Sequence, residues 1–139
     1  MYQLAAEKIS GITEQTYQNY NMVRGTELEP EARAVYEMEN EVEVIVPGFQ
    51  LHHSGLYGGS ADGLVGDDGM IEIKCPIATT HVEYLECGKL PTTYFQQVHG
   101  YLLIYDRQWC DFFSYYPGIR PFQIRVYPDM DFQKKLHHE

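Results

Sequence analysis

The sequence predicts a single domain of the α/β (α+β) class. Its 139 residues are enough for one hydrophobic core and leave no room for a second domain. A hydrophobic content of 44% with 14% aromatic residues is typical of a globular fold. Segments with helical periodicity lie on both sides of a strong β-hairpin signal. We therefore expect residues 1–139 to form one domain in which helices flank a sheet.

The spacing of apolar residues predicts each element. Residues 27–40 repeat apolar side chains at helical spacing, and Pro30 is tolerated in the first turn of the helix expected there. The segments "DGLV" and "MIEIKC" flank Gly-Asp-Asp-Gly at 66–69, which predicts a hairpin. The other predicted elements are strands over 41–47, 109–116 and 122–128, a short strand and a loop within 49–59, and helices over 92–106 and 129–139.

Composition limits the classes of function. Three widely spaced cysteines favour a reduced, intracellular setting and argue against zinc or iron–sulfur sites with paired cysteine ligands. No apolar run of about 18 residues is present, and "MYQLAAEKIS" lacks the pattern of a signal peptide, so we expect neither a membrane span nor a leader. The net charge of −10 is unusual for a nucleic-acid binder, but bound metal ions can supply local positive charge.

The predicted hairpin contains the charged residues that point to a reaction. A turn centred near Asp67 places Asp62 opposite Glu72, and strand alternation directs Glu72 and Lys74 to the same face. Two opposed carboxylates repel unless a cation lies between them, and oxygen ligands suit Mg²⁺ or Mn²⁺. A lysine beside such a site can help to activate water next to a phosphate, as in metal-assisted phosphodiester hydrolysis. The same spacing also fits a surface hairpin with a Glu–Lys ion pair.

The sequence segments around these residues resemble those of a known family. Asp62 followed by Glu72-Ile73-Lys74 resembles the signature of the PD-(D/E)xK nucleases. "RGTELEPEARAVYE", "GGSADGLVGDDGMIEIKCP", "YFQQVHGYLLIY" and "WCDFFSYYP" together resemble the YqaJ-like viral recombinase, or lambda-type exonuclease, family. The resemblance covers roughly residues 22 to 132 in the family's order. It implies a restriction-endonuclease-like core, with a central mixed β-sheet and a catalytic hairpin flanked by helices.

The resemblance also implies a metal centre. Asp62, Glu72 and the carbonyl of Ile73 would be ligands of Mg²⁺, for which Mn²⁺ would substitute, and two ions are expected. Glu29 would reach the site from the upstream helix, although neighbouring Glu27 is an alternative match. Lys74 would position the attacking water.

Further residues are implied to contact the site or the DNA. Gln97 and Tyr101, four apart on a helix, would share a face, the glutamine at the site and the tyrosine on the DNA strand or in the core. Ser60 would help to bind a 5′-phosphate, or be a plain turn residue, and His81 is a further candidate for a DNA contact. The loop at 77–81 has no arginine where the family holds a terminal phosphate, which puts 5′-phosphate dependence in doubt.

The implied function is a Mg²⁺-dependent exonuclease that degrades linear duplex DNA from 5′ to 3′ in phage-type recombination. It would act in the cytoplasm of a bacterial host or phage-infected cell and pass single strands to an annealing protein, and a ring-shaped homotrimer follows by analogy. The N-terminal part is short and the chain ends within its last predicted helix, so it is either minimal or truncated. Two alternatives stay open: a structure-specific endonuclease and a catalytically silent DNA- or protein-binding module. The intact set of Asp62, Glu72, Lys74 and Gln97 favours an enzyme.

Overall fold

The computed structural model describes residues 11–48, 50–51, 58–59 and 61–131. Its helices are α2 (Gly11–Asn40), α3 (Ala78–Cys87) and α4 (Phe95–Ile104), with a 3-10 turn η1 (Thr92–Tyr94) directly before α4. Its strands are β1 (Val44–Ile45), β2 (Gln50–Leu51), β3 (Gly58–Gly59), β4 (Gly63–Val65), β5 (Gly69–Lys74), β6 (Trp109–Ser114) and β7 (Phe122–Val126). None of the helices in these ranges has both the length and the apolar character needed to cross a membrane.

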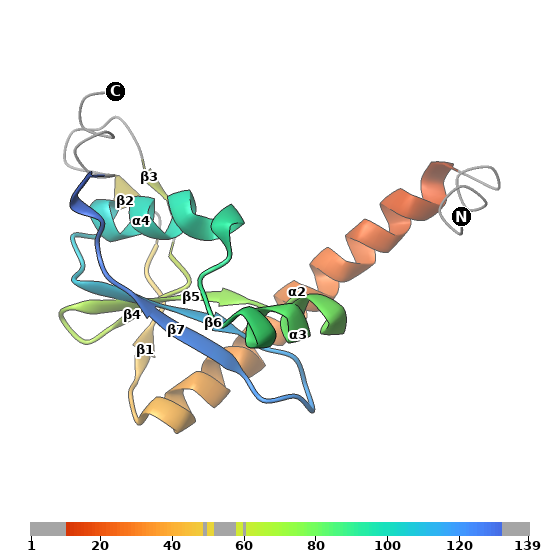
Figure 1. Cartoon of the computed structure of the whole chain (residues 1–139), viewed down its shortest axis with the longest axis horizontal. Coiled ribbons are helices and arrows are strands. Elements are labelled where there is room, and N and C mark those ends of the chain that lie inside the picture. Colours follow the sequence, from red (N-terminus) through yellow and green to blue (C-terminus); the bar gives the residue numbers. More distant parts are fainter. Residues whose placement is uncertain (1–10, 49, 52–57, 60, 132–139) are drawn as a thin grey trace.

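A mixed sheet of five strands forms the centre of the fold (Figure 1). The strand order is β1-β4-β5-β6-β7, and β2 pairs separately with β3. Among the described strands, only β5 and β6 run parallel, and the chain crosses from one to the other through α3, η1 and α4. The other pairs of the large sheet are antiparallel. The predicted mixed sheet with flanking helices is therefore confirmed.

The hairpin forms with the predicted register. Gly63 pairs with Ile71, and Leu64 pairs with Met70, so the next position outward sets Asp62 against Glu72. The turn begins at Gly66, whose φ of 58° lies in the left-handed region that glycine enters without steric cost. This register brings the charged residues of the two hairpin arms to one end of the ladder.

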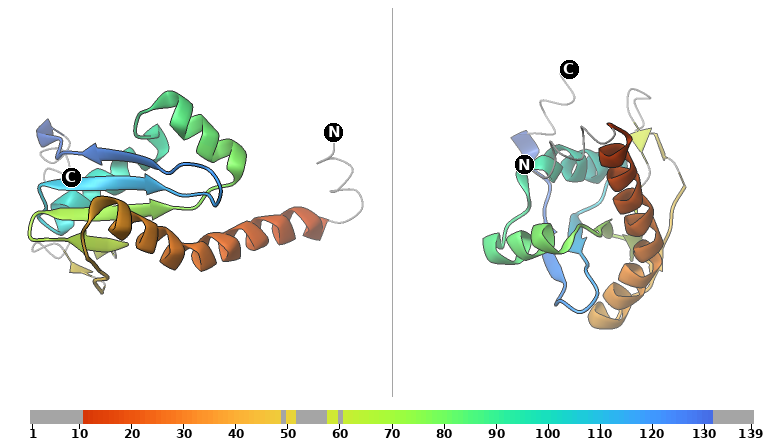
Figure 2. Two further views of the ribbon diagram at one scale, coloured as in Figure 1. Left: turned by 90° about the horizontal axis from the view of Figure 1, so that it is seen from below. Right: turned by 90° about the vertical axis from the view of Figure 1, so that its right-hand side faces the viewer.

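Helices cover both faces of the sheet (Figure 2). On one face, apolar residues of β5 and β6 pack against α3 and α4, and this cluster includes Met70, Val98, Leu102, Cys110 and Phe112. On the other face, the C-terminal half of α2 packs against the same strands, with Ala32, Tyr36, Ile71, Ile73 and Phe113 in the cluster. The N-terminal half of α2 extends past the sheet, as the left view of Figure 2 shows.

Three predicted boundaries were wrong. Helix α2 begins by Gly11 rather than at residue 27, so Pro30 lies inside the helix, where it removes one backbone donor. The strand predicted over 41–47 shortens to β1, which has two residues. The stretch at 77–81, taken as a loop, contains the first turn of α3. Helical structure at residues 130–131 agrees with the last predicted helix, most of which lies outside the described residues.

A buried carboxylate fastens α2 to the sheet. Asp111 on β6 is fully buried and accepts hydrogen bonds from the Tyr36 hydroxyl (2.6 Å) and from Arg125 Nε (2.8 Å) and Nη2 (3.0 Å). Gln123 Nε2 lies 3.3 Å from the same carboxylate. Donors from α2 and β7 thus converge on one anion, which compensates for its loss of hydration.

A second anchor closes the turn end of the hairpin. Gly69 lies under the ring of Trp109, its neighbour across the parallel β5–β6 pair, and a Cβ at Gly69 would overlap that ring. The guanidinium of Arg125 stacks on the same ring, 3.5 Å from its centroid. A glycine is required at this position because the indole occupies the space of any side chain.

We predict that Asp111→Ala destabilises the fold. The Tyr36 hydroxyl would remain buried without an acceptor, which costs about 1–3 kcal/mol, whereas the side chain of Arg125 is 42% exposed and can turn to water. Urea unfolding would measure the change, with Asp67→Ala in the exposed turn as a control expected within about 0.5 kcal/mol of wild type. Equal stability of the Asp111 variant and the control would contradict a fastening role.

Candidate active site

The site lies along the edge of β5 that faces β4, beyond the point where the β4–β5 pairing ends. Pairing with β4 ends at Gly63 and Ile71, whereas pairing with β6 continues to Lys74. The Ile73 N–H donates instead to Oδ2 of Asp62, at 2.7 Å. Since the N–H and C=O of one residue in a strand face the same edge, the Ile73 carbonyl is also directed to this side.

The position of Asp62 is itself fixed by α4. The hydroxyl of Tyr105, at the end of α4, accepts the N–H of Ala61 at 3.1 Å and donates to the carbonyl of Gly48 at 3.1 Å. Tyr105 and Ala61 are both buried in the cluster between the sheet and α4. The residue before Asp62 is therefore held in place, and the carboxylate projects along the free edge of β5.

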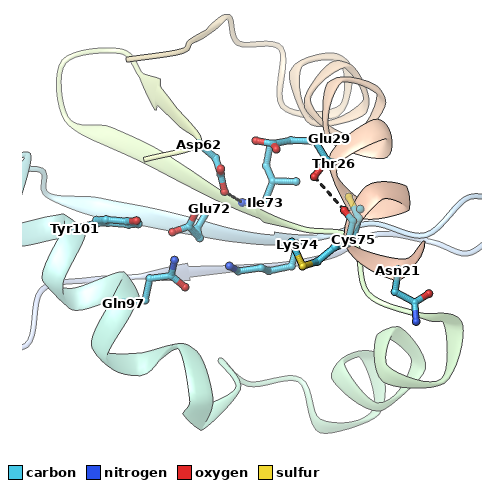
Figure 3. A pocket seen from close by; sticks show the side chains of 12 residues that line it. Asn21, Thr26, Glu29, Asp62, Glu72, Ile73, Lys74, Cys75, Gln97 and Tyr101 are labelled. Carbon is cyan, nitrogen blue, oxygen red and sulfur yellow. Dashed lines mark hydrogen bonds between the residues drawn. The ribbon is translucent and has the colours of Figure 1, made fainter. Parts of the chain in front are cut away.

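A cavity of about 400 Å³ lies at this edge, between the hairpin, α2 and α4. Figure 3 shows the side chains of Asp62, Glu72 and Lys74, from the hairpin, and of Gln97, from α4, directed toward one another. The residues that line the cavity are Asn21, Met22, Gly25, Thr26, Glu29, Asp62, Glu72, Ile73, Lys74, Cys75, Gln97 and Tyr101. The cavity thus brings together the seven residues proposed for the metal centre and for α4, which are Glu29, Asp62, Glu72, Ile73, Lys74, Gln97 and Tyr101.

Of the two candidate glutamates on α2, Glu29 is the one that lies at the cavity. It lines the cavity, whereas Glu27 is exposed and does not. Burial raises the pKa of Glu29, and a hydrogen bond with Asp62 and the negative charge of Asp62 raise it further. The positive charges of Arg33 and Lys74 act in the opposite direction and lower this pKa. Arg33 Nη2 lies 3.3 Å from Glu29 Oε1, one helical turn away, so Glu29 is held by its own helix.

Glu72 has the most unusual environment in the site. Only 2% of this residue is exposed, and its Oε2 is buried without a hydrogen-bond partner among the described residues. Burial, then a hydrogen bond with Asp62 and the charge of Asp62, raise the pKa of Glu72 to about 10, against the opposing charge of Lys74. A surface Glu–Lys pair is therefore excluded, because an exposed glutamate would not be buried and unsatisfied in this way.

The donor set fits a divalent cation. A buried carboxylate oxygen without a hydrogen-bond partner among the residues that the structure describes, next to a second carboxylate and a backbone carbonyl, offers the hard oxygen ligands that Mg²⁺ prefers. Within the described part of the chain, no three His, Cys, Asp or Glu side chains are grouped to hold a metal by themselves. Mg²⁺ is usually bound through one or two carboxylates and retains several waters, so Asp62, Glu72 and the Ile73 carbonyl are a sufficient set.

Lys74 and α4 complete the wall of the cavity. Lys74 Nζ lies 4.7 Å from the centroid of the Tyr94 ring, on the same face of the sheet as Glu72. Gln97 and Tyr101 both line the cavity from α4. Burial raises the pKa of Tyr101, and a hydrogen bond with Gln97 opposes this increase. Tyr101 also packs against the hydrophobic cluster under α4, so the same side chain can belong to the core and face the cavity.

Of the candidates for DNA contacts, His81 is not brought to the cavity and Ser60 is not among the described residues. His81 is fully buried, and its ring nitrogens lie 2.8 Å from Ser114 Oγ and 2.7 Å from the Arg120 carbonyl. With both nitrogens bonded inside the protein, His81 cannot contact DNA in this structure and instead connects α3 to the sheet.

Sequence reasoning missed one wall of the cavity. Asn21, Gly25 and Glu29 follow one another at intervals of four along α2 and therefore share a face. Only Glu29 was proposed, because the helix was expected to begin at residue 27. The regular spacing of Asn21, Gly25 and Glu29 was the available signal, and it points to a wall two turns longer.

Comparisons with known proteins show that the sequence and the fold are similar to those of exonucleases. An alkaline exonuclease from Laribacter hongkongensis is 40% identical, with a TM-score of 0.81 over 85% of this chain and 63% of that chain. Its crystal structure in complex with dAMP gives the same identity and TM-score over 86% and 64%. A phage-related exonuclease from Haemophilus somnus 129PT, 16% identical with a TM-score of 0.66 over 84% and 66%, shares the fold.

The chain thus spans just under two thirds of the length of these relatives. No curated protein is similar enough in sequence to count as a match. The sequence pattern of the YqaJ-like viral recombinase domain matches residues 1–108, and that stretch contains every residue proposed for the metal centre. The chain belongs to the YqaJ-like viral recombinase domain family.

Proposed function

We propose that this protein is a Mg²⁺-dependent exonuclease that hydrolyses phosphodiester bonds from the ends of linear duplex DNA, in the 5′-to-3′ direction. The single observation that supports this most strongly is the buried oxygen of Glu72, which has no hydrogen-bond partner in the described part of the chain and lies next to Asp62 and Lys74. A carboxylate placed in this way is unfavourable for stability, and its placement is accounted for if a cation completes the site. The exonuclease names of the relatives support the same reaction class.

The residues of the chain divide the chemistry among them. Asp62, Glu72 and the Ile73 carbonyl would hold Mg²⁺, with Glu29 near a second ion, and the metal would supply charge stabilisation of the phosphate and acidify water. Lys74 would donate hydrogen bonds to the attacking water and keep it oriented toward the phosphorus. Gln97 would fix the water or a phosphate oxygen through its amide, and Tyr101 would lie against the DNA strand.

A nucleotide complex of a relative points to the product of the proposed reaction. The relative from Laribacter hongkongensis forms a complex with dAMP, and we propose that the cavity of this chain likewise accepts a deoxynucleoside monophosphate. We further propose that the protein acts in the cytoplasm of a bacterial or phage-infected cell, that it passes single strands to an annealing protein, and that it assembles as a homo-oligomer, with a ring trimer as the first candidate.

Lys74→Ala is expected to lower the cleavage rate by on the order of 10²–10⁴-fold, because the water loses its orienting donor. Binding of DNA in Ca²⁺ should persist, since the carboxylates and the Ile73 carbonyl are unchanged. The rate of release of nucleotides from a labelled linear duplex would measure the effect, with Lys89→Ala, an exposed lysine after α3, as the matched control. A Lys74 variant that cleaves as fast as the control would remove Lys74 from the mechanism.

The metal-free protein should lose stability as the pH rises. The pKa of Glu72 is raised from 4.5 to about 10 in the fold, so the folded state keeps a proton that the unfolded state releases. The contribution of Glu72 to stability is therefore complete below pH 4.5 and is lost progressively as the pH rises toward 10. Glu72→Gln should remove this loss, because its side chain does not ionise.

Urea unfolding in EDTA at about pH 5 and about pH 9 would test this expectation, with Glu86→Gln on the exposed side of α3 as the control. Adding Mg²⁺ at the higher pH should stabilise wild type and leave Glu72→Gln unchanged. If wild type and Glu72→Gln respond identically to pH and Mg²⁺, then Glu72 is not a metal ligand.

End dependence is expected as well. With Mg²⁺, linear duplex should be degraded while a covalently closed circle is spared, because an exonuclease requires a free end. The stretch at 77–81 has no arginine, so we expect only a modest preference for 5′-phosphorylated over 5′-hydroxyl ends, with fewer charge-assisted bonds to the phosphate. Incubation with equal amounts of the three substrates gives the answer, and rapid nicking of the circle would favour an endonuclease instead.

A further inference from the structure

The Lys74 ammonium has an unexpected partner. The Lys74 ammonium lowers the pKa of Glu29 and of Glu72 and therefore lies near both carboxyl groups, yet within the described residues it forms an ion pair with neither. Its Nζ lies instead over the ring of Tyr94, 4.7 Å from the centroid. An aromatic face attracts a cation through its quadrupole, and this contact competes with the pull of the two carboxylates.

The Tyr94 ring is held firmly enough to act as a support. It belongs to η1, immediately before α4, and packs on Phe112 with ring centroids 5.3 Å apart. Tyr84 on α3 is hydrogen-bonded to Tyr94 and packs edge-on against the same Phe112 ring, at 5.9 Å. Contacts from α3 and β6 thus fix the ring, so its face cannot turn away from Lys74 without disturbing the core.

Tyr94 also belongs to the side of the helical segment that forms the site. Tyr94, Gln97 and Tyr101 are three and four positions apart, which places them on one side of η1 and α4. Gln97 and Tyr101 line the cavity directly, whereas Tyr94 contacts it through Lys74. One helical side therefore supplies both the groups facing the substrate and the support for the lysine.

We propose that Tyr94 is a positioning residue for the cleavage reaction, and that its ring face holds the Lys74 ammonium away from Glu29 and Glu72. This inference rests on the proposed function, in which Lys74 orients the attacking water. A ring face attracts the ammonium without occupying its N–H groups as a carboxylate would, so these donors stay available for water and phosphate oxygens. Without the ring, the ammonium would move onto a carboxylate and neutralise part of the site intended for the metal.

A graded series at Tyr94 tests the electrostatic part of the contact. Tyr94→Phe retains the ring face, a trifluorinated phenylalanine retains the shape but weakens the negative face, and Tyr94→Leu removes the ring. We expect kcat near wild type for Phe, lower for the fluorinated residue, and lower by roughly tenfold for Leu, with little change in KM. A fluorinated variant as active as the Phe variant would overturn the proposal, and both variants keep the shape of the core.

Val126→Ala is the packing control. Val126, like Tyr94, is partly buried against the same cluster, but it lies opposite Cys110 in the β6–β7 pair rather than beside Phe112. The variant should lower the melting temperature and leave kcat unchanged. A loss of kcat in Val126→Ala equal to that in Tyr94→Leu would show that the effect at Tyr94 is only one of packing, which would also overturn the proposal.

A measurement without DNA separates this proposal from the proposed function. Protons on Lys74 Cε over a ring face give an upfield-shifted NMR signal, which should persist in Tyr94→Phe and disappear in Tyr94→Leu. If wild type cleaves DNA but shows no such shift, positioning by Tyr94 is wrong while the nuclease stands. If the shift is present and wild type cleaves no DNA with Mg²⁺ or Mn²⁺, the proposed function fails, and the reaction role of Tyr94 fails with it.

Discussion

The short pairing of β4 with β5 is the constraint on which the rest of the site depends. Because the ladder ends at Gly63, the outer edge of β5 would expose an unpaired N–H at Ile73, and a buried backbone donor requires a partner. Asp62 supplies that partner through its side chain. The same arrangement leaves space at the edge of the sheet, where groups from both faces can meet: Glu29 from the side of α2, and Glu72 and Lys74 from the side of α4.

Two buried carboxylates on neighbouring strands show how differently the fold treats the same chemical group. Asp111 receives hydrogen bonds from Tyr36 and Arg125, so its charge is compensated and it serves to attach α2. Glu72 has a buried oxygen with no partner among the described residues, and its neighbour Asp62 adds repulsion. Asp111 nevertheless contributes to the site, since Tyr36 anchors the helix that brings Glu29 to the cavity, seven residues or about two turns earlier.

The hairpin and the pairing of its charged residues could be predicted because the signals are local. The turn residues at 66–69 and the alternation along β5 fix the register, and the register brings Asp62 to the side of Glu72. The burial of Glu72 was not predictable in the same way, because it depends on how α4 packs over the strand. Its raised pKa is a property of the assembled fold.

The errors in the helices also have physical causes. Proline is a common signal for the first turn of a helix, but Pro30 lies deep in α2. The sequence before it is polar, so no apolar periodicity indicated that the helix begins earlier. Helix α3 has no side-chain cap at Ile77 and no acidic residue in its first turn, so its start carries no signal. Its end did carry one, since Gly88 has a φ of 66° and donates its N–H to the Tyr84 carbonyl at 2.9 Å.

The indole that lies over Gly69 has a practical consequence. Trp109 is the only tryptophan of the chain, and its ring lies between the turn end of the hairpin and the guanidinium of Arg125. Its fluorescence therefore comes from a single, defined place in the sheet. Opening of the β5–β6 edge would release the indole to water and separate it from a cationic neighbour, which changes both the wavelength and the intensity of emission. The cavity lies toward the opposite end of β5, so the protein contains an optical reporter of its folding that is remote from the groups proposed to bind DNA.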